Sequence, residues 1–222
     1  MKELGKPVLD SFATIRQSLQ EYRSDELAIA FNGGKDSVVL LYLLDLAFKL
    51  KSKETQDSSY NISHICTIFI DLEHSFKEVN EYVREVVDSY NLKLVTLTQF
   101  KEGLKELKEE YPHIKGIYMG TRRDDPYGAT LPLYKKTDPG WPDFMRIHPI
   151  LDLSYQDIWN VIQRFGLSYC KLYDEGYTSI GETNNTIPNP ALQYTDHQGN
   201  TKYYPAYMLQ DGSKERDGRI KK

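Results

Sequence analysis

The sequence has 222 residues, and its 28 Lys and Arg against 32 Asp and Glu give a formal net charge of −4. This balance excludes a general nucleic-acid-binding protein, which needs a basic face or stripe. The apolar fraction of 40% and the charged fraction of 27% are ordinary for a folded globular chain. The longest apolar run, Val38–Leu44, is too short to span a bilayer, so we expect small-molecule ligands and neither nucleic acid nor membrane as a partner.

The two cysteines, Cys66 and Cys170, lie far apart and form no CxxC pair. This spacing predicts reduced thiols and disfavours both a disulfide framework and a cysteine-built zinc site. The first residues contain no apolar leader segment. We therefore expect a cytoplasmic protein, and we expect it to be a monomer.

Strands alternate with helices through the first 121 residues. Apolar spacing predicts, in order, a helix around residues 9–22, a strand at 27–31, a helix from about 37 to 50, a polar loop at 51–61, a strand at 65–71, a helix at 76–90, a strand at 92–97, a helix around 100–107 and a strand at 115–121. Alternation of this length is typical of βαβ units. The predicted fold class is α/β, a doubly wound and mainly parallel sheet with helices on both faces.

The pattern changes after Thr121, because five of the ten prolines fall between Arg122 and Pro149 among several aromatic residues. A loop of this length inside a compact domain is usually functional or disordered, and its aromatic content favours function. A helix follows at 154–166, and an irregular lobe follows from residue 168, ending in the charged run 213–222. We therefore expect a core at 1–167, which includes the loop at 122–149, and a C-terminal lobe at 168–222.

A glycine-rich turn joins the first strand to the second helix and reads Asn-Gly-Gly-Lys-Asp-Ser at residues 32–37. Gly33 and Gly34 allow the backbone to approach a ligand closely, and the free N–H groups of the helix favour an anion. Lys35 adds a charge and Ser37 a hydroxyl for phosphate binding. A carboxylate at Asp36 would repel phosphate unless a cation such as Mg²⁺ lay between them, so the turn predicts a phosphate site with a metal.

This segment resembles the PP-loop of ATP pyrophosphatases of the adenine nucleotide alpha-hydrolase type, whose usual form is SGGxDS. Asn32 replaces the leading serine here. The resemblance implies cleavage of ATP between its α- and β-phosphates, with transfer of AMP to an acceptor. The motif alone leaves the acceptor open among sulfate, tRNA bases, carboxylates and a phosphorylated small molecule.

Three later segments narrow the acceptor. GTRRDDPYGATLPLYKKTDPGWPDFMRIHPILDLSYQDIW (120–159), YDEGYTSIGETNNTIPNPAL (173–192) and AYMLQDGSKERDGR (206–219) resemble the eukaryotic FAD synthetase family. These FMN adenylyltransferases are related to the PAPS reductases and have a Rossmann-like core. The resemblance implies transfer of AMP from ATP to FMN, giving FAD and pyrophosphate with Mg²⁺. PAPS reductase activity is disfavoured, because that family needs a C-terminal catalytic cysteine and neither cysteine fits that role.

The resemblance also implies roles for individual residues. Its flavin site is lined by Asp138, Trp141 and Arg146. Its active-site floor is shaped by Arg122 and Asp125. Its reacting phosphates are bracketed by Arg216 and Arg219.

The residues themselves suggest further roles. Asp71 ends a predicted parallel strand at its carboxyl end, where open sheets bind ligands, so it is a candidate adenine contact. Asn32 or Asp36 would hold Mg²⁺, and Gly33, Gly34, Lys35 and Ser37 would cradle the leaving pyrophosphate. Alanine at Asp36 or Arg216 is expected to abolish turnover without unfolding the protein.

Several alternatives stay open at this point. Arg216 and Arg219 can also be read as a solvated basic tail, and Trp141 as a packing residue under a proline-rich loop. One alternative function is a PP-loop ATP pyrophosphatase with a different acceptor. Another is a non-catalytic module that senses flavin or nucleotide. A sensor has no evident need for Asp36 beside phosphate, and this disfavours the second alternative.

Overall fold

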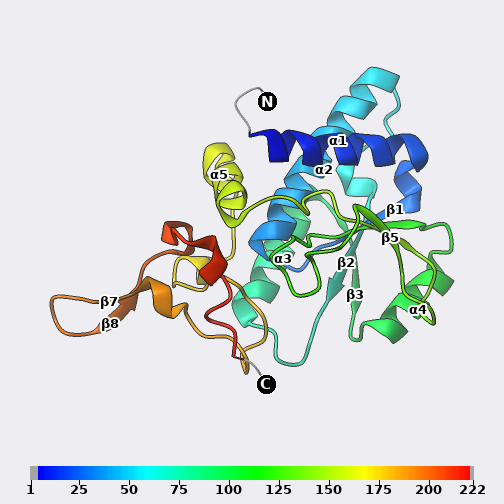
Figure 1. Ribbon diagram of the computed structural model, residues 1–222. Helices are drawn as coiled ribbons and strands as arrows, with labels where there is room; N and C mark the ends of the chain where they lie inside the picture. The colour runs from blue at the N-terminus through cyan, green and yellow to red at the C-terminus, as the bar shows by residue number, and fades with distance from the viewer. Residues whose placement is uncertain (1–4, 221–222) are drawn as a thin grey trace.

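The computed structural model describes residues 5–220, so the first four and last two residues of the ranges expected above lie outside it. A six-stranded sheet forms the centre of the molecule, in the order β3-β2-β1-β4-β6-β5 (Figure 1). Its strands are β1 (Leu27–Ala30), β2 (Cys66–Ile70), β3 (Lys93–Leu97), β4 (Gly116–Tyr118), β5 (Tyr134–Lys136) and β6 (Met145–Ile147). All neighbours pair in parallel except β5 with β6. The predicted mainly parallel α/β sheet is confirmed.

Helices cover both faces of this sheet. They are α1 (Lys6–Glu21), α2 (Lys35–Thr55), α3 (Lys77–Tyr90), α4 (Lys101–Glu110) and α5 (Tyr155–Phe165). One core joins the apolar sides of α1, α2, α3 and α5 with Leu27, Ile29 and Phe31. A second core joins Leu107 of α4 with Ala28, the residue between Leu27 and Ile29. Alternate residues at β1 thus face opposite layers, which is the period-two pattern of a strand buried on both sides.

Two short elements lie where the sequence predicted only loops. The segment 122–149 contributes β5 and β6, which pair antiparallel at the edge of the sheet. Three-residue strands among prolines carry too little periodicity to be read from the sequence.

The helix α2 starts at Lys35 and ends at Thr55, so residues 51–55 are helical, although the sequence predicted a loop there. Their polar side chains face solvent and leave no apolar repeat, and Gln56 ends the helix in a left-handed conformation.

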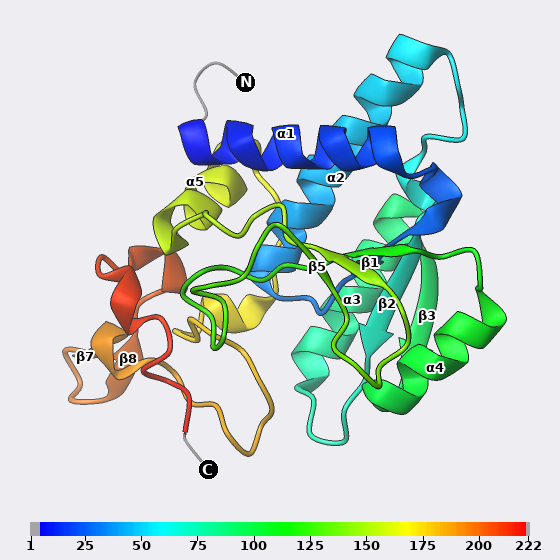
Figure 2. The same cartoon turned by 45° about the vertical axis from the view of Figure 1, so that its right-hand side comes forward.

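The C-terminal lobe is built from single turns and one hairpin. The antiparallel strands β7 (Gln193–Thr195) and β8 (Thr201–Tyr203) form this hairpin, which projects from the body in Figures 1 and 2. The lobe is anchored to α5, because the Tyr155 hydroxyl donates to the Ala206 carbonyl at 2.7 Å. The boundary at residues 167/168 stays a prediction.

The predicted helix at 154–166 and the predicted unpaired cysteines are confirmed. The α5 helix begins with Ser154 and Asp157 in a reciprocal capping box and ends at Gly166 with φ 58°. Cys66 and Cys170 are buried and free. Within residues 5–220 no helix has the length and apolar character needed to cross a bilayer.

We expect stability to fall below neutral pH because of His148, which is 2% exposed and has no hydrogen-bond partner on either ring nitrogen among the described residues. Burial, helped by the Arg146 and Lys135 cations, lowers its pKa to about 4, so the folded state holds the neutral form. The stabilisation is present above the unfolded pKa near 6.5 and is lost as pH falls toward 4.

Urea unfolding should therefore give about 1 to 2 kcal/mol less stability from this residue at pH 5 than at pH 8. His148→Leu should flatten that pH dependence, whereas leucine at the exposed His197 should leave it unchanged. An equally steep pH dependence in the His148 variant would contradict the assignment.

Candidate active site

A cavity of about 470 Å³ opens at the carboxyl ends of β1 and β4, where the order of the strands reverses. Open α/β sheets bind ligands at this point because the two connections diverge there. The cavity is lined by the turn after β1, by the ends of β2 and β4, by the lobe and by the C-terminal segment. Segments far apart in sequence therefore share one cavity.

The turn after β1 is shaped by its glycines. Gly33 has φ +72°, and a Cβ there would lie 2.9 Å from the Cγ2 of Val83 on α3, so only glycine fits without movement. The Gly34 N–H donates to Asn32 Oδ1 at 3.0 Å, and the Ser37 hydroxyl donates to the Gly34 carbonyl at 2.8 Å. The N-cap residue Gly34 has no capping side chain, and the Lys35 N–H that follows it donates to the Tyr173 hydroxyl at 2.9 Å. Gly34, Asp36 and Ser37 line the cavity, so the rest of the positive end of this helix is open to an anion.

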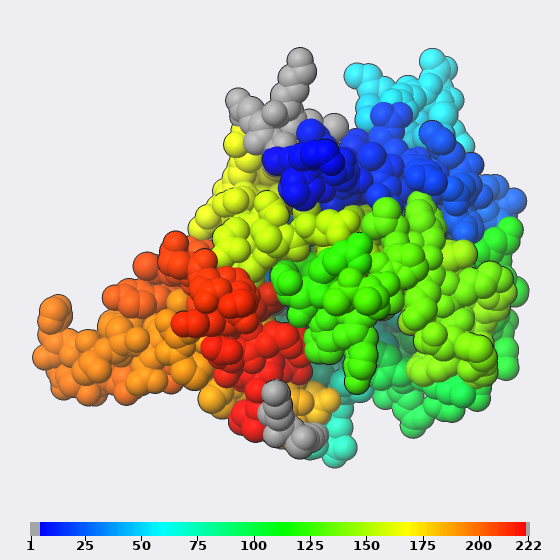
Figure 3. Space-filling view, in the orientation of Figure 1, coloured from blue at the N-terminus to red at the C-terminus, as the bar shows by residue number. Residues whose placement is uncertain are grey.

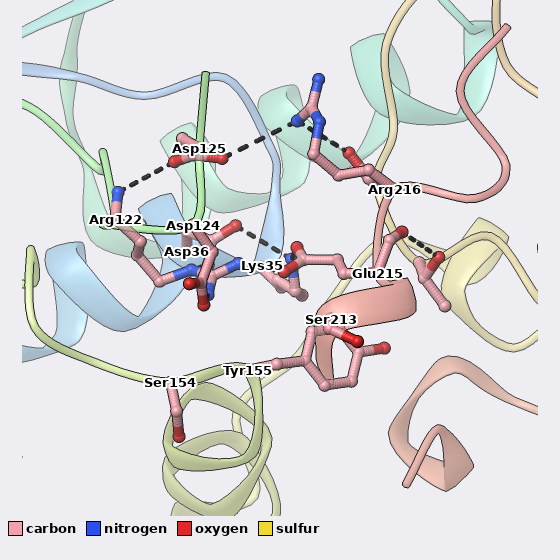
Figure 4. A network of polar contacts seen from close by, with 12 residues as sticks. Lys35, Asp36, Arg122, Asp124, Asp125, Ser154, Tyr155, Ser213, Glu215 and Arg216 are labelled. Carbon is pink, nitrogen blue, oxygen red and sulfur yellow. Dashed lines mark hydrogen bonds and ion pairs between the residues drawn. The ribbon is translucent and has the colours of Figure 1, made fainter. Parts of the chain in front are cut away.

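Behind this turn lies a buried network of four charged side chains (Figure 4). Lys35 Nζ lies 3.0 Å from Asp36 Oδ2 and 2.5 Å from Glu215 Oε1. Arg122 donates from Nε to Asp36 Oδ1 at 2.6 Å and from Nη2 to Glu215 Oε2. The side chains of Lys35 and Arg122 are 2% and 0% exposed. Lys35 was predicted to offer phosphate a point charge, but its ammonium group is bound to carboxylates in this structure.

The ionisation of the network follows from its geometry. Burial opposes the charged form of Asp36, but the Lys35 and Arg122 cations outweigh burial and lower the pKa of Asp36. Burial likewise opposes the charge of Lys35, but Asp36 and Glu215 outweigh it and raise the pKa of Lys35. Two cations therefore face two anions in a low-dielectric site, and their charges sum to zero.

Two arginines from the C-terminal segment reach the cavity. Arg216 Nη1 lies 3.4 Å from the Ser179 hydroxyl and 3.7 Å from Asp125 Oδ1. Burial, together with the neighbouring Arg216 cation, lowers the pKa of Arg219. Figure 3 shows this segment beside the segment that follows β4. The reading of these arginines as a solvated tail is wrong, because both line the cavity.

The structure brings most of the predicted site residues together. The cavity wall includes Asn32, Gly34, Lys35, Asp36, Ser37, Asp125, Arg216 and Arg219. Gly33 supports the turn, and Arg122 is buried behind Asp36. Asp71 lies between the cavity residues Ile70 and Leu72, and its Oδ1 accepts from Asn80 Nδ2 at 3.1 Å.

The predicted flavin residues form a separate group on the β5–β6 hairpin. Arg146 Nη2 lies 3.3 Å from Asp138 Oδ2. Trp141 is 39% exposed, and Lys101 Nζ lies 5.7 Å from its ring centroid. Phe100, next to Lys101 in the chain, is 56% exposed and lines the cavity. None of the three predicted flavin residues lines the cavity, and Trp141 is linked to it through Lys101, the chain neighbour of Phe100.

Two residues at the site received no role from the sequence. Tyr173 accepts the Lys35 N–H on its hydroxyl at 2.9 Å, and Glu215 joins the buried network. Glu215 lies between Lys214 and Arg216 within the segment that resembles FAD synthetases. The sequence of an irregular segment does not reveal that one of its carboxylates is buried. The resemblance of residues 206–219 to FAD synthetases was therefore the only signal that included Glu215.

Gly181→Ala is expected to lower turnover at least tenfold while leaving the fold intact. A Cβ at Gly181 would overlap the Arg219 guanidinium, which is the far end of a flexible side chain and can move away. A tenfold loss of rate corresponds to about 1.4 kcal/mol of transition-state stabilisation. Removing a charge-stabilising group commonly costs more than this. The measurement compares kcat and thermal midpoint with those of Gly5→Ala, whose φ is −53° and whose Cβ would make only an ordinary contact with Pro7 at 3.6 Å. A normal kcat would show that Arg219 has no role at its present position.

The sequence matches the family described as "Phosphoadenosine phosphosulfate reductase domain" over residues 26–118 and 101–188. It is 40% identical to a probable FAD synthase of Schizosaccharomyces pombe, over 94% of this chain and 77% of that protein. It is 33% identical to the flavin adenine dinucleotide synthase of Saccharomyces cerevisiae, over 76% of this chain and 60% of that protein. The chain spans only 38% of a probable FAD synthase of Caenorhabditis briggsae, at 36% identity.

Solved structures agree with these relatives. The FMN adenylyltransferase of Candida glabrata in complex with FAD and inorganic pyrophosphate superposes with a TM-score of 0.89 at 26% identity. That match covers 98% of this chain and 88% of the other. Yeast FAD synthetase in complex with FAD gives a TM-score of 0.83 at 28% identity, over 96% and 90% of the two chains. The chain belongs to the FAD synthase (FMN adenylyltransferase) family, within the PAPS reductase-like PP-loop proteins.

Proposed function

We propose that this chain transfers the AMP moiety of ATP to FMN, giving FAD and pyrophosphate, and that the cavity at the β1–β4 crevice is where it does so. The observation that carries the proposal is the convergence there of the open α2 N-terminus with Arg216 and Arg219. The ligands named for the Candida glabrata structures, FMN with the ATP analogue AMPCPP and FAD with pyrophosphate, support the same substrates.

The reaction needs no protein nucleophile. A terminal phosphate oxygen of FMN forms a bond to the α-phosphorus of ATP, and the bond to the bridging oxygen breaks in line, so that pyrophosphate leaves with the electron pair. The attacking oxygen is already anionic, and no general base is required. Catalysis then rests on positioning and on stabilising the charge of the transition state.

The PP-loop and the two arginines share this work in our proposal. The backbone of Gly34 and the first turn of α2, with the Ser37 hydroxyl, would hold the leaving pyrophosphate. Arg216 and Arg219 would meet the negative charge on the α-phosphate, since the charges of Lys35 and Arg122 are matched by carboxylates. Asp125 would keep Arg216 directed at the cavity. Asp71 remains our candidate beside the adenine.

A magnesium ion fits the donor set that this site offers. Mg²⁺ bound with nucleotides uses one or two protein oxygens and fills its shell with phosphates and water. Asn32 is exposed, and its amide oxygen accepts only the neutral Gly34 N–H, whereas both oxygens of Asp36 already accept from cations. Asn32 would therefore be the principal ligand, with Asp36 using a remaining lone pair. Bound Mg²⁺ would neutralise phosphate charge.

Trp141→Ala is expected to weaken FMN binding about tenfold. An aromatic side chain that is 39% exposed beside the cavity suits a flavin ring, and an aromatic stack contributes about 1 kcal/mol or more. Fluorescence titration gives the FMN dissociation constant, and Trp159→Phe, in the buried core, serves as the control. An unchanged dissociation constant for the Trp141 variant would remove it from the flavin site.

Pyrophosphate release tests the function itself. The protein is incubated with ATP and Mg²⁺, with and without FMN, and FAD is separated by chromatography. FMN-dependent pyrophosphate with equal FAD is the expected result. Pyrophosphate without FAD would indicate another acceptor, and nucleotide binding without either product would indicate a sensor. We also propose that the chain acts as a cytoplasmic monomer, and size-exclusion chromatography with light scattering tests the monomeric state.

A further inference from the structure

Glu215 ties three separate parts of the chain together. It lies on the segment Gly212–Arg219, which we term the C-terminal arm. Its Oε1 accepts from Lys35 at the start of α2, and its Oε2 accepts from Arg122, which follows β4. The residue is only 5% exposed. One buried carboxylate therefore bridges the arm to both walls of the crevice (Figure 4).

The rest of the arm is fastened to the lobe rather than to the crevice. The Thr178 hydroxyl donates to the backbone oxygen of Glu215 at 2.6 Å, and Asn189 Nδ2 donates to the Lys214 carbonyl at 2.8 Å. Thr178 and Asn189 are 1% and 0% exposed. These bonds fix the path of the arm, but the Glu215 side chain supplies its bond to α2.

The position of Glu215 also determines where the next residue lies. Arg216 follows it directly, and its guanidinium sits between Ser179 and Asp125 at distances of 3.4 and 3.7 Å. These are long contacts, and the side chain is 37% exposed, so they hold Arg216 weakly. The strong anchor is one residue away and is charge-assisted.

We propose that Glu215 is a positioning residue: bound by Lys35 and Arg122, it fixes the C-terminal arm so that Arg216 lies against the phosphates of ATP. This inference rests on the proposed function. It assigns Lys35 to the arm rather than to phosphate, and it makes the position of Arg216 dependent on the ion pairs of its neighbour Glu215.

Glu215→Gln tests the proposal. Glutamine keeps the shape and one oxygen, but its amide group faces a cation where the carboxylate oxygen lay. We expect kcat for FAD formation to fall about 30- to 100-fold, while the KM for ATP and the dissociation constant of FMN change less than threefold. Glu215 itself lines the cavity, but glutamine has nearly the same volume. The PP-loop backbone is unaltered by the change, and the Tyr155–Ala206 bond still anchors the lobe.

The chain offers a matched control in Glu26→Gln. Glu26 is 7% exposed and pairs with Lys115 Nζ at 2.5 Å, but it lies at the opposite end of β1 from the PP-loop. A structural effect of losing a buried carboxylate should appear in both variants as a lower thermal midpoint. Only the Glu215 variant should lose turnover, with Glu26→Gln within twofold of the unchanged protein. Equal turnover losses in the two would overturn the proposal.

A double-variant cycle separates positioning of Arg216 from any other effect. In an Arg216→Ala background, measured by single-turnover FAD formation, Glu215→Gln should cost less than threefold further. A full 30-fold additional loss would overturn the proposal, because Glu215 would then act independently of Arg216. If the unchanged protein forms no FAD, the proposed function fails instead, and the two failures are distinguishable.

Thr178→Val gives a second test should Glu215→Gln not fold. It keeps all four buried charges and removes only the hydroxyl. That hydroxyl donates a hydrogen bond to the Glu215 carbonyl and accepts one from Asn189 Nδ2. Asn189 keeps its bond to the Lys214 carbonyl. We expect kcat to fall at least threefold with unchanged FMN affinity. An unchanged kcat would overturn the dependence of turnover on the position of the arm.

Discussion

Arg216→Ala should lower kcat for FAD formation by a factor of about 100 or more while leaving the thermal midpoint nearly unchanged. Losing one preorganised electrostatic contact to a transition state costs roughly 3 kcal/mol. Arg216 lines the cavity, and within residues 5–220 its nearest carboxylate is Asp125 at 3.7 Å. Its side chain is 37% exposed, so its removal opens no cavity in the core. Steady-state kinetics and thermal unfolding measure both quantities.

Lys214→Ala is the control for Arg216. It removes the same charge two residues away from an exposed side chain, so kcat should stay within twofold. Near-normal turnover in the Arg216 variant would remove this arginine from the mechanism. Equal losses in both variants would show that the net charge of the arm, rather than the place of one guanidinium, matters.

Asp36→Ala should abolish turnover and also destabilise the protein by about 3 to 5 kcal/mol, the usual cost of leaving a buried charge without its partner. Lys35 and Arg122 are both essentially inaccessible to water. They would then share Glu215, and Arg122 would keep in addition only the exposed Asp124, whose Oδ2 lies 3.5 Å from its Nη1. For a domain of this size the loss corresponds to a fall of roughly 6 to 20 °C in Tm. The expectation that this variant loses turnover without unfolding stays a prediction, and the buried network adds to it a lower Tm.

Asp45→Ala is the matched control for Asp36. The Asp45 carboxylate is 8% exposed and pairs with Lys49 at 2.6 Å, but Lys49 is 71% exposed and returns to water when its partner is removed. Denaturant unfolding should show less than half the loss seen for Asp36→Ala. If the two variants lose equal stability, the buried cations are not what makes Asp36 costly to remove.

The order of the elements was accessible from the sequence because apolar periodicity reflects burial directly. The run at 27–31 and the stripe of α5 fix a strand and a helix locally. The helical residues 51–55 were missed because that stretch is polar on every side and carries no such signal. The strands β5 and β6 were missed because their pairing is non-local and only three residues long.

The site residues likewise fall into those that the sequence alone could group and those that it could not. The residues of the PP-loop are adjacent in sequence and carry their chemistry as a motif, so their grouping was predictable. Arg216 and Arg219 were assigned only through a resemblance, since irregular segments do not reveal where they fold. The partners of Lys35 were not predictable, because whether an ammonium group meets phosphate or carboxylate depends on a contact 180 residues away.

That separation has a consequence for how the protein comes to be active during synthesis. The sheet can pair once residue 147 has emerged, but the contact between residues 35 and 215 closes a loop across 180 positions of the sequence. Loop closure of this kind is entropically costly and comes late in folding. A nascent chain that ends before the arm leaves Lys35 and Arg122 without Glu215, so under our proposal competence for catalysis arrives only after the arm has been synthesised.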